Sequence, residues 1–378
     1  MKLALIAPAP IPANTANSIQ VMKMAQAYAR LGHKVCLFAP GKLGEVAWDA
    51  LAEHYGLSQP FAIERLPANR ALRGYDYAYR AVRRARHWGA ALIHTRLPQA
   101  AAWAADNGLP TIYELHDLPS GFMGPRLFRL FTQAQGARAL VVVSQALAEA
   151  LKGQFPQLKA DNLLRVHPDG VDVERYKSLP PPPVARQQLD LPDAFTLGYT
   201  GHLYAGRGVQ LILQLAAQLP DLRFLLVGGH PVDVERVRSQ IAEQQLANIT
   251  LTGFVPNAQL PLYQAASDVL LMPYQARVAA SSGGDIAAFL SPMKMFEYLA
   301  AGRPILASDL PVLAEVLTPQ NAIILPQDDP QRWIDAIQRL AADPKSGEQI
   351  AAAARRTAAR HTWEQRAAAI LKGIPAHA

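Results

Sequence analysis

Cysteine is almost absent from this sequence, which has 378 residues and one cysteine, Cys36. A single cysteine excludes a disulfide framework and fits a reducing compartment, so we expect a cytoplasmic protein. Long apolar runs are missing too. The first residues, MKLALIAPAPIP, contain only a short apolar run that ends in prolines. This run is too short for a membrane-spanning helix and lacks a cleavage-site pattern, so we interpret it as a buried first strand.

Charged residues are scarce as well, at 18% of the chain, whereas half of the residues are hydrophobic. This composition supplies a sizeable core and is not typical of a disordered chain. The length suits two domains or one large domain.

The basic excess is concentrated in one segment. The formal net charge is +7, and residues 65–88, RLPANRALRGYDYAYRAVRRARHW, contain seven arginines and a single acidic residue, Asp76. Helical spacing places Arg80, Arg83 and Arg84 on one side. Such a patch attracts anionic lipid headgroups, at roughly 1 kcal/mol for each basic residue near the surface, although a solvated helix face has the same composition. We expect a membrane surface as the partner of this segment, and no nucleic acid.

Apolar, β-rich runs alternate with helical segments in the first part of the chain. Near-continuous apolar strands with helices between them predict a parallel sheet covered on both faces. The predicted strands are KLALIA (2–7), HKVCLFA (33–39), AALIHT (90–95), PTIYEL (110–115) and ALVVVS (139–144), with helices at 18–31 and near 45–55.

The alternation stops at SLPPPPVARQQLDLPDA, residues 178–194. Four consecutive prolines are incompatible with a helix interior or a central strand, so we predict a stiff, extended linker. The alternation then resumes. The predicted strands are FTLGYT (195–200), RFLLVGG (223–229), NITLTG (248–253), DVLLMP (268–273), RPILAS (303–308) and NAIIL (321–325), with helices near 208–218, 231–245, 258–266, 292–301 and 329–342.

The pattern therefore predicts an α/β protein with two doubly wound, Rossmann-like domains. We place the N-terminal domain at 1–178, the proline-rich linker at 179–194 and the C-terminal domain at 195–355, with a last helix at about 356–375 that packs back onto the first domain. Ligands of such sheets bind beyond the carboxyl ends of the strands, so we expect the chemistry in a cleft between the domains.

The stretch GGDIAAFLSPMKMFEYLAAGRPILASD, residues 283–309, has the signals of a short helix and its anion site. Ser291 is a suitable N-cap and Pro292 suits the first helical position. The free N–H groups of the helix N-terminus, close to Gly283 and Gly284, favour a phosphate, and Lys294 adds a positive charge. Glu297 lies further into the helix, where its carboxylate can accept hydrogen bonds from a diol such as a ribose. A capped surface helix would have much the same sequence.

A second stretch, GYTGHLYAGRGVQLILQLA (198–216), predicts a strand, a glycine-bearing loop and a helix that begins near Gly208. Arg207 precedes that helix and His202 follows the strand. Loop glycines, a helix N-terminus and an arginine together can hold a diphosphate, with roughly 1.5–3 kcal/mol from a charge-assisted hydrogen bond. The loop matches neither the dinucleotide fingerprint nor the Walker pattern.

Four stretches in order along the chain resemble retaining glycosyltransferases of family 4, which have the GT-B architecture. They are HPDGVDVERY (167–176), YTGHLYAGRGVQLIL (199–213), LTGFVPNAQLPLYQAASDVLLMPY (251–274) and SPMKMFEYLAAGRPILASDLPVLAEV (291–316). In the N-terminal part, YARLGHKVCLFAP and YELHD are similar to the family more loosely. The resemblance implies a nucleoside-diphosphate-sugar donor held by the C-terminal domain and an acceptor held by the N-terminal domain.

The resemblance assigns roles residue by residue. Glu297 matches the glutamate that binds the donor ribose, Arg207 matches the basic residue on the diphosphate, and His116 matches the histidine that reaches the transferred sugar. His202 stands where the family usually has an arginine. The predicted donor-binding residues are Gly201, His202, Arg207, Phe254, Val255, Leu290, Ser291, Pro292, Met293, Lys294 and Glu297.

One position departs from the family pattern. Phe289 occupies the place of the family's first glutamate, which touches the hydroxyls of the transferred sugar. Asp285, four residues upstream, can supply the missing carboxylate, so we take His116, Asp285 and Arg207 as candidate catalytic residues. For the acceptor, the strand ends and the loop before the first helix offer polar groups. The candidate acceptor-binding residues are Asn14, Thr15, Asn17, Ser18, His94 and Arg96.

The resulting prediction is a hexosyltransferase that moves a hexose from a UDP- or GDP-sugar to a hydroxyl of a lipid-linked or saccharide acceptor, with retention of configuration. Because cationic side chains and helix amides neutralise the leaving diphosphate, we expect no metal and no resident cofactor. Relatives with a basic N-terminal patch glycosylate membrane lipids, which favours a lipid-linked acceptor at the inner face of the membrane. Two alternatives stay open: a non-catalytic nucleotide-sugar-binding relative, suggested by Phe289, and a nucleotide-sugar epimerase on the same architecture.

Overall fold

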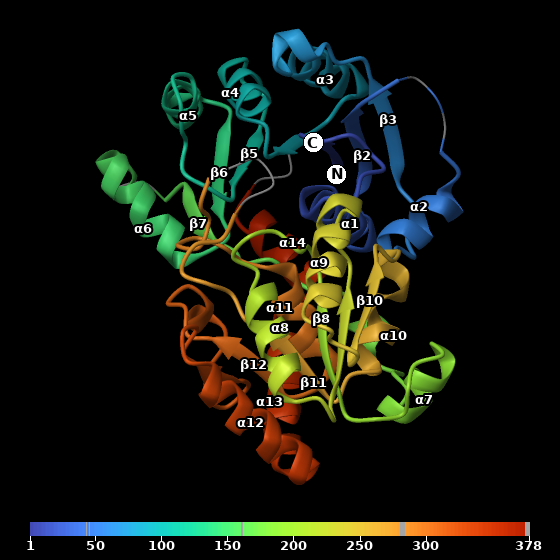
Figure 1. Cartoon of the computed structure of the whole chain (residues 1–378). Helices are drawn as coiled ribbons and strands as arrows, with labels where there is room; N and C mark the ends of the chain where they lie inside the picture. Colours follow the sequence, from blue (N-terminus) through green and yellow to red (C-terminus); the bar gives the residue numbers. More distant parts are fainter. Residues whose placement is uncertain (43, 45, 160–161, 280–283, 375–378) are drawn as a thin grey trace. The chain divides into compact units, whose positions relative to one another are not determined.

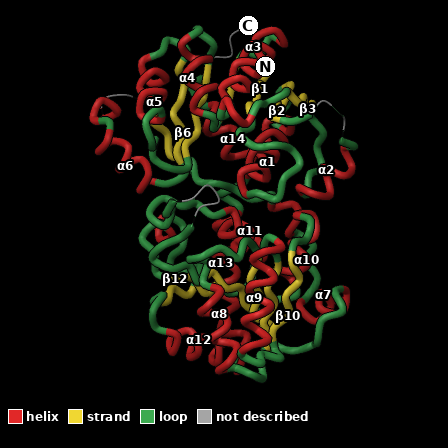
Figure 2. The backbone as a smooth tube through the Cα atoms, turned by 45° about the horizontal axis from the view of Figure 1, so that its top comes forward, coloured by secondary structure: helices red, strands yellow, loops and turns green. Residues whose placement is uncertain are grey.

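The computed structural model describes the chain except for residues 43, 45, 160–161, 280–283 and 375–378 (Figure 1). Contacts divide the chain into two units, Met1–Asp169 with Trp363–Ala378, and Gly170–Thr362. Each unit is built on one parallel β-sheet with helices on both sides, which confirms the α/β class predicted from the alternation of strands and helices (Figure 2).

The first unit has a seven-stranded sheet in the order β3-β2-β1-β4-β5-β6-β7, and all of its pairings are parallel. The order reverses between β1 and β4, so the chain winds outward in both directions from the centre. Its strands are β1 (Lys2–Ile6), β2 (Lys34–Pro40), β3 (Ala62–Leu66), β4 (Leu92–Thr95), β5 (Thr111–Leu115), β6 (Ala137–Val142) and β7 (Leu164–Val166).

Helices cover the sheet of the first unit on both faces. Its helices are α1 (Ala16–Arg30), α2 (Trp48–Tyr55), α3 (Tyr75–Trp88), α4 (Pro98–Asp106), α5 (Gly124–Gln133), α6 (Gln145–Gln154) and α14 (Trp363–Leu371). One apolar cluster joins α3 and α4 to β1 and β2 through Tyr77, Ala104 and Phe38. Helix α14, from the end of the chain, packs on α1.

Two strands of this unit, β3 and β7, are missing from the sequence prediction. Both lie at the edges of the sheet. An edge strand can contain charged residues, which interrupt the continuous apolar run that identifies a central parallel strand. The sequence of β3, AIERL, mixes charged and apolar residues, and β7, LRV, is only three residues long.

The second unit has a six-stranded parallel sheet in the order β10-β9-β8-β11-β12-β13. All six strands agree with the sequence prediction. They are β8 (Thr196–Thr200), β9 (Arg223–Val227), β10 (Ile249–Gly253), β11 (Val269–Met272), β12 (Ile305–Ser308) and β13 (Ile323–Leu325).

The helices of the second unit pack on both faces of its sheet. They are α7 (Pro182–Gln188), α8 (Val209–Gln218), α9 (Pro231–Glu243), α10 (Leu260–Ala265), α11 (Met293–Ala301), α12 (Pro330–Ala342) and α13 (Glu348–Ala358). Helices α8, α9 and α12 share one apolar cluster with the strands, with Trp333 fully buried in it. A second cluster joins α7 and α10 to β9. Short 3-10 turns are η1 (Arg70–Leu72), η2 (Pro156–Lys159), η3 (Val173–Tyr176), η4 (Asn257–Gln259), η5 (Leu313–Glu315) and η6 (Pro344–Gly347).

The proline-rich segment is not an extended linker, and this part of the prediction is wrong. Pro182 and Pro183 begin helix α7, with Pro181 in the cap position. Prolines are tolerated in a first helical turn because the N–H groups there have no helical partner. Arg186 then ties the helix to the second unit, since its guanidinium bonds to carboxylate oxygens of Asp193 at 2.8 Å and Asp268 at 2.9 Å. The segment therefore belongs to the second unit rather than to a free connection.

Candidate functional site

Two loops of the second unit, predicted to share a phosphate, meet in the structure. The loop after β8 starts at Gly201, whose φ is +131°. A Cβ atom on Gly201 would lie 2.9 Å from Lys294 Nζ, which belongs to the first turn of α11. At the other end of the loop, Gly208 caps α8 in the left-handed region. Neither helix has an acidic residue in its first turn, so both N-termini keep their affinity for an anion.

Helix α11 begins one residue later than the sequence predicts. Pro292 occupies the cap position and Met293 is the first helical residue, and no side chain caps the helix. The predicted N-cap role of Ser291 is therefore wrong. The helix ends at Ala301, as predicted, and Gly302 caps it in the left-handed conformation.

Lys294 points its ammonium group at aromatic rings instead of at a carboxylate. Its Nζ lies 3.7 Å from the ring centre of Tyr199 and 5.5 Å from that of Tyr274. Among the described residues, this buried nitrogen has no hydrogen-bond partner. Burial, together with the neighbouring Arg207, lowers the pKa of Lys294 well below its ordinary value. A desolvated cation without a partner is expensive unless an anion completes its surroundings.

Arg207 lies beside the ring of Tyr274, one of the two tyrosines near Lys294. One of its terminal nitrogens donates to Tyr274 Oη at 2.9 Å, and its guanidinium carbon lies 5.1 Å from the ring centre. Its Nε is buried and has no hydrogen-bond partner among the described residues. Tyr274 thus holds Arg207 and Lys294 on one surface, although they are far apart in sequence. The sequence prediction missed Tyr199 and Tyr274, because a tyrosine in or after an apolar strand has no signal that separates it from the core.

His202 belongs to a cluster of three rings with Tyr204 and His230, whose own ring centres are 5.8 Å apart. Its ring centre lies 4.7 Å from that of Tyr204, nearly parallel to it, and 5.0 Å from that of His230. Its backbone carbonyl accepts a hydrogen bond from Tyr199 Oη at 2.5 Å. Burial, His230 and Arg207 lower the pKa of His202 to about 4, so the ring is neutral near pH 7. Its buried Nδ1 has no hydrogen-bond partner among the described residues.

Glu297 lies one turn along α11 from Lys294, on the same side of the helix. Gln264, which is completely buried, donates from Nε2 to Glu297 Oε2 at 3.4 Å and to Thr200 Oγ1 at 3.2 Å. The second contact fixes the amide relative to the end of β8, and Tyr298 Oη accepts from the Thr200 N–H at 2.7 Å. Glu297 is therefore held at the site by its neighbours, while it is only partly buried.

The remaining donor candidates lie at the same ends of the strands. Phe254 follows β10 and its side chain is 44% exposed, next to the partly buried Val255. Leu290 is buried before α11. Gly283, part of the predicted anion loop, lies outside the described residues. Asp285 is exposed, and its Oδ1 accepts N–H groups of Val278 and of Ala287 at 2.9 Å each, which lowers the pKa of the carboxyl group.

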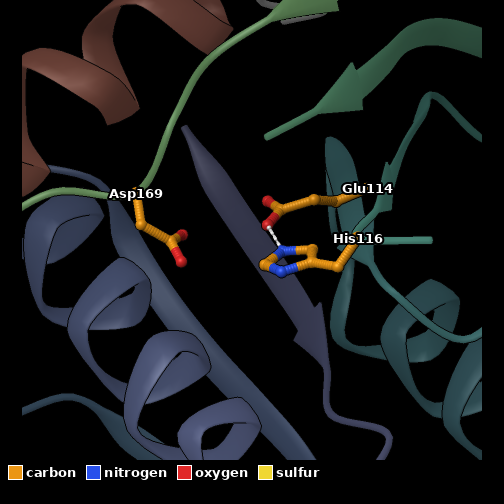
Figure 3. Close-up of side chains that lie close together, drawn as sticks. All are labelled: Glu114, His116 and Asp169. Atoms are coloured by element: carbon orange, nitrogen blue, oxygen red, sulfur yellow. Dashed lines mark hydrogen bonds and ion pairs between the residues drawn. The ribbon is translucent and has the colours of Figure 1, made fainter. Parts of the chain in front are cut away.

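In the first unit, His116 directly follows β5 and is paired with a glutamate. Its Nε2 lies 2.6 Å from Glu114 Oε1 (Figure 3). The two residues are two positions apart, and alternate residues of a strand face the same side of the sheet. The His116 side chain is 21% exposed, whereas that of Glu114 is fully buried. Glu114 was absent from the sequence prediction, although the spacing Glu-x-His at a strand end was a usable signal.

His94 and Arg96, predicted to bind the acceptor, lie on the neighbouring strand β4 and just after it. His94 is buried, and both ring nitrogens are engaged, with Tyr28 Oη at 3.0 Å and with Glu114 Oε2 at 3.0 Å. In the structure His94 is therefore a hydrogen-bond partner of Glu114. Arg96 is partly buried and reaches Gln20 Oε1 at 3.5 Å.

The polar loop before α1 uses part of its predicted acceptor groups for its own turn. Thr15 is the N-cap of α1, since its side chain accepts from the Ser18 N–H at 3.2 Å. The Ser18 hydroxyl is buried and donates to the Ala13 carbonyl at 2.5 Å. Asn14 is exposed and Asn17 is partly buried, so these two side chains are the ones left to meet a ligand.

The basic segment 65–88 separates into two parts. Arg65 lies in β3 and donates to the Ile11 carbonyl, and Arg84 pairs with Glu64 at 2.6 Å. The exposed basic side chains of α3 are those of Arg80, Arg83, Arg84, Arg86 and His87. Across the described residues, no helix combines the length and the apolar character needed to cross a membrane.

The three residues Glu114, His116 and Asp169 form a group in which one ligand atom of each lies within 4.8 Å of the others. In Figure 3 the carboxylate of Asp169 points toward the His116 ring. Arg366 Nη2 lies 3.0 Å from Glu114 Oε1 and 4.0 Å from Asp169 Oδ1. The guanidinium of Arg366 lies among these groups, and its positive charge would repel a divalent cation placed there.

Solved structures place the fold. Anabaena HepE, solved with UDP-glucose, has a TM-score of 0.73 and 20% identity, covering 99% of this chain and 100% of that chain. WaaG, a glycosyltransferase involved in lipopolysaccharide biosynthesis, has a TM-score of 0.65 and 16% identity over 98% of this chain and 100% of that one. The two parallel-sheet units therefore have the GT-B fold of glycosyltransferases.

The family follows from the sequence comparisons. The model of Glycosyltransferase Family 4 matches residues 18–175, and that of Glycosyl transferases group 1 matches residues 194–343. The chain belongs to the family 4, group 1 glycosyltransferases that these two models describe, as the four motifs predict.

Curated relatives are distant and matched in part. TuaH of Bacillus subtilis, named for teichuronic acid biosynthesis, is 28% identical over 213 residues, 56% of this chain and 51% of that protein. A D-inositol 3-phosphate glycosyltransferase of Corynebacterium urealyticum is 31% identical over 198 residues, 48% of this chain and 43% of that protein. The match thus spans about half the length of each of these relatives.

Proposed function

We propose that this protein transfers a hexose from a nucleoside-diphosphate sugar, with UDP or GDP as the leaving group, to a hydroxyl of a lipid-linked or saccharide acceptor. The observation that carries the proposal is a set of buried nitrogen atoms without hydrogen-bond partners among the described residues: Lys294 Nζ, Arg207 Nε and His202 Nδ1. Lys294 and Arg207 lie at the starts of α11 and α8, whose first turns contain no acidic residue, and His202 lies in the loop between β8 and α8. A diphosphate supplies the acceptors and the negative charge that this arrangement lacks.

The donor site would act on the leaving group. Negative charge develops on the diphosphate as the bond to the anomeric carbon breaks. In this proposal Lys294, Arg207 and the amides of α8 and α11 stabilise that charge. In this proposal the cationic side chains take the part of a metal, and no resident cofactor is needed. Glu297 is placed one turn away, where it would accept the ribose hydroxyls.

The names of similar structures support a UDP donor. HepE has been solved with UDP, with UDP and glucose, and with UDP-glucose, and TarM with UDP and a saccharide. We carry the donor type to this chain as a proposal. The family resemblance suggests retention of configuration, with the leaving phosphate as the base. His116 would contact the transferred sugar, and Asp285 is the candidate for the carboxylate missing at Phe289.

We place the acceptor on the first unit, at Asn14, Asn17 and Arg96. A lipid-linked acceptor is supported by the exposed arginines of α3 and by a second patch at the start of α5. There Phe122 is 77% exposed, with the guanidinium of Arg126 3.6 Å from its ring centre. Exposed aromatic and basic side chains together suit the interface of an anionic membrane.

The donor proposal is tested by thermal melts with UDP, GDP and their glucose and mannose derivatives. We expect one nucleotide series to raise the melting temperature of the wild type. Arg207→Ala and Glu297→Ala should lose most of that response, while Arg238→Ala, an exposed arginine paired with Glu235 in the same unit, should keep it. No stabilisation by any of these nucleotides, or equal responses in all variants, would refute the donor site.

The membrane part is tested separately by sedimentation with vesicles of phosphatidylcholine, with and without phosphatidylserine. We expect binding only with the anionic lipid, and a loss of binding in an Arg80→Ala/Arg83→Ala variant. Binding to neutral vesicles, or no change in the variant, would contradict the role of α3.

The comparisons favour neither the epimerase nor the non-catalytic alternative. Consumption of the donor that depends on an acceptor distinguishes a transferase from both.

A further inference from the structure

Glu114 of the first unit accepts several hydrogen bonds, and the proposed chemistry does not use it directly. Its carboxylate is fully buried and receives hydrogen bonds from four side chains. The donors are Gln20 Nε2 at 2.6 Å, His116 Nε2 at 2.6 Å, His94 Nε2 at 3.0 Å, and Arg366 through Nη2 at 3.0 Å and Nη1 at 3.2 Å. They come from α1, β4, the end of β5 and α14.

This carboxylate is ionised. Burial alone would raise the pKa of the Glu114 carboxyl, but Arg366 and the hydrogen bonds from His116 and His94 together hold the pKa well below its ordinary value. Arg366 is itself buried, with 3% of its side chain exposed. It also donates to the carbonyls of Pro168, at 2.9 Å, and His167, at 3.2 Å, and to Met24 Sδ at 3.2 Å. The guanidinium is thus fixed on several sides and cannot follow a displaced partner.

An ionised carboxylate only accepts hydrogen bonds, which determines the protons on its two histidine neighbours. Both His94 and His116 must carry hydrogen on Nε2. For His94 this leaves Nδ1 to accept from the Tyr28 hydroxyl at 3.0 Å, which agrees with the observed contact. For His116 it leaves Nδ1 as a lone pair on the opposite side of the ring from Glu114 (Figure 3). Burial and the nearby Arg96 lower the pKa of His116, so its ring is neutral at pH 7.

We propose that Glu114, held by Arg366, is a positioning residue that fixes His116 as the Nε2–H tautomer and presents its Nδ1 as a hydrogen-bond acceptor to a sugar hydroxyl. This inference rests on the proposed function for the identity of the ligand, but not for the tautomer. A neutral histidine in this state accepts a hydrogen bond from a hydroxyl and donates none to it. The ring orientation and the proton position are both set before any ligand arrives.

Two features distinguish this arrangement from a purely structural ion pair. A buried ion pair adds little stability compared with apolar residues of the same volume, so stability does not explain it. Further, the carboxylate is aimed at a partly exposed histidine at the carboxyl end of a parallel strand, where ligands of such sheets bind. The positive charge comes from residue 366, in the last helix of the chain, 252 residues from Glu114. Helix α14 therefore supplies the guanidinium that holds Glu114, and through Glu114 it helps to orient His116.

The test uses the full-length protein labelled with ¹⁵N-histidine. Two-bond ¹H–¹⁵N spectra report the tautomer of each ring without any substrate, and a His116→Gln variant assigns the signal. In the wild type we expect His116 to be neutral and protonated on Nε2 at pH 7 and above. A wild-type His116 that is protonated on Nδ1, mixed or charged at pH 7 would overturn the proposal, even if every variant failed to fold.

Three variants extend the test. Glu114→Gln has nearly the same shape but offers one oxygen and one amide NH2, so at least one of His94 and His116 must accept from it and change its tautomer. Arg366→Lys keeps the charge and should retain the wild-type tautomers, whereas Arg366→Gln should not. Unchanged tautomers of both histidines in a folded Glu114→Gln protein would overturn the proposal.

The last measurement separates this inference from the proposed function. UDP binding depends on the second unit, so Glu114→Gln should change the UDP dissociation constant by less than about twofold. With a sugar donor identified by the melts, we expect turnover to fall roughly 10- to 100-fold, the effect of losing one hydrogen bond to a buried group. If no nucleotide binds but the tautomer is as expected, the donor proposal fails and the positioning role stands. If UDP binds and turnover is unchanged in Glu114→Gln, the positioning role fails and the donor site stands.

Discussion

Gly201 and Lys294 are in contact although they are 93 residues apart: a Cβ on the glycine would lie 2.9 Å from the lysine Nζ. The glycine begins the loop after β8, and the lysine belongs to the first turn of α11. This contact brings two helix N-termini and two cations to one place. It is the relationship on which the proposed donor site depends.

Replacing Gly201 by alanine should therefore disturb both stability and nucleotide binding. Its φ of +131° is unfavourable for any residue with a Cβ, so we expect a loss of about 1 kcal/mol in the free energy of unfolding. The new methyl group would also push the Lys294 ammonium aside and weaken UDP binding. Chemical denaturation and calorimetric titration measure the two effects. Gly153→Ala, in α6 with open space around it, is the control and should be neutral or slightly stabilising.

Lys294→Met should stabilise the empty protein and abolish tight nucleotide binding. The folded-state pKa of Lys294 is lowered, so the unfolded chain binds more protons below pH 10.5 and the lysine costs stability at pH 7. Methionine removes that cost, roughly 1 kcal/mol or more. UDP affinity should fall roughly 10- to 100-fold with the loss of a charge-assisted hydrogen bond. A variant that melts lower than the wild type without nucleotide, yet binds UDP equally well, would show that this lysine is merely structural.

Diphosphate binding should be accompanied by proton uptake. Burial, followed by the charges of His230, Arg207 and Lys294, lowers the pKa of His202 to about 4. Asp233 raises this pKa, and the ring of Tyr204 stacks on the imidazole. An anion raises the pKa values of His202 and Lys294, so the complex binds more protons than the free protein. UDP affinity should then decrease as pH rises from 6 to 9. Titration calorimetry in Pipes and in Tris gives the number of protons, and equal heats in the two buffers would contradict the prediction.

Acid should destabilise the first unit through His167. Burial, followed by the charges of Arg366 and Arg165, lowers the pKa of His167 to about 4. Because the unfolded histidine titrates near 6.5, stability is fully present above that value and is lost as pH falls from 6.5 toward 4. The ring is partly exposed, so we expect only about 1 kcal/mol from it. Urea unfolding of His167→Asn at pH 7 and pH 5 should show a smaller difference than the wild type, while His87→Asn, on the exposed face of α3, should not.

Much of the fold was predictable because its signals are local. Buried parallel strands require continuous apolar runs, and helices require caps, so the central strands and the helix at 293–301 follow from short stretches of sequence. The edge strands β3 and β7 and the helix α7 escaped prediction. The charged residues of β3 and β7 interrupt the apolar run by which a buried strand is recognised. Prolines are found at the start of a helix as well as in loops, so they did not reveal α7.

The sequence by itself determined two parallel sheets, the helix N-termini at their strand ends and the candidate groups Arg207, Lys294, Glu297 and His116. Only the tertiary structure decided which partners these groups have. The aromatic surface under Lys294, the stack around His202 and the ion pair of Glu114 with Arg366 join residues far apart in the chain. Such contacts leave no periodic pattern in the sequence, because they depend on where packing brings distant segments together. Packing also decides whether a charged side chain is exposed, paired with another residue or buried without a partner.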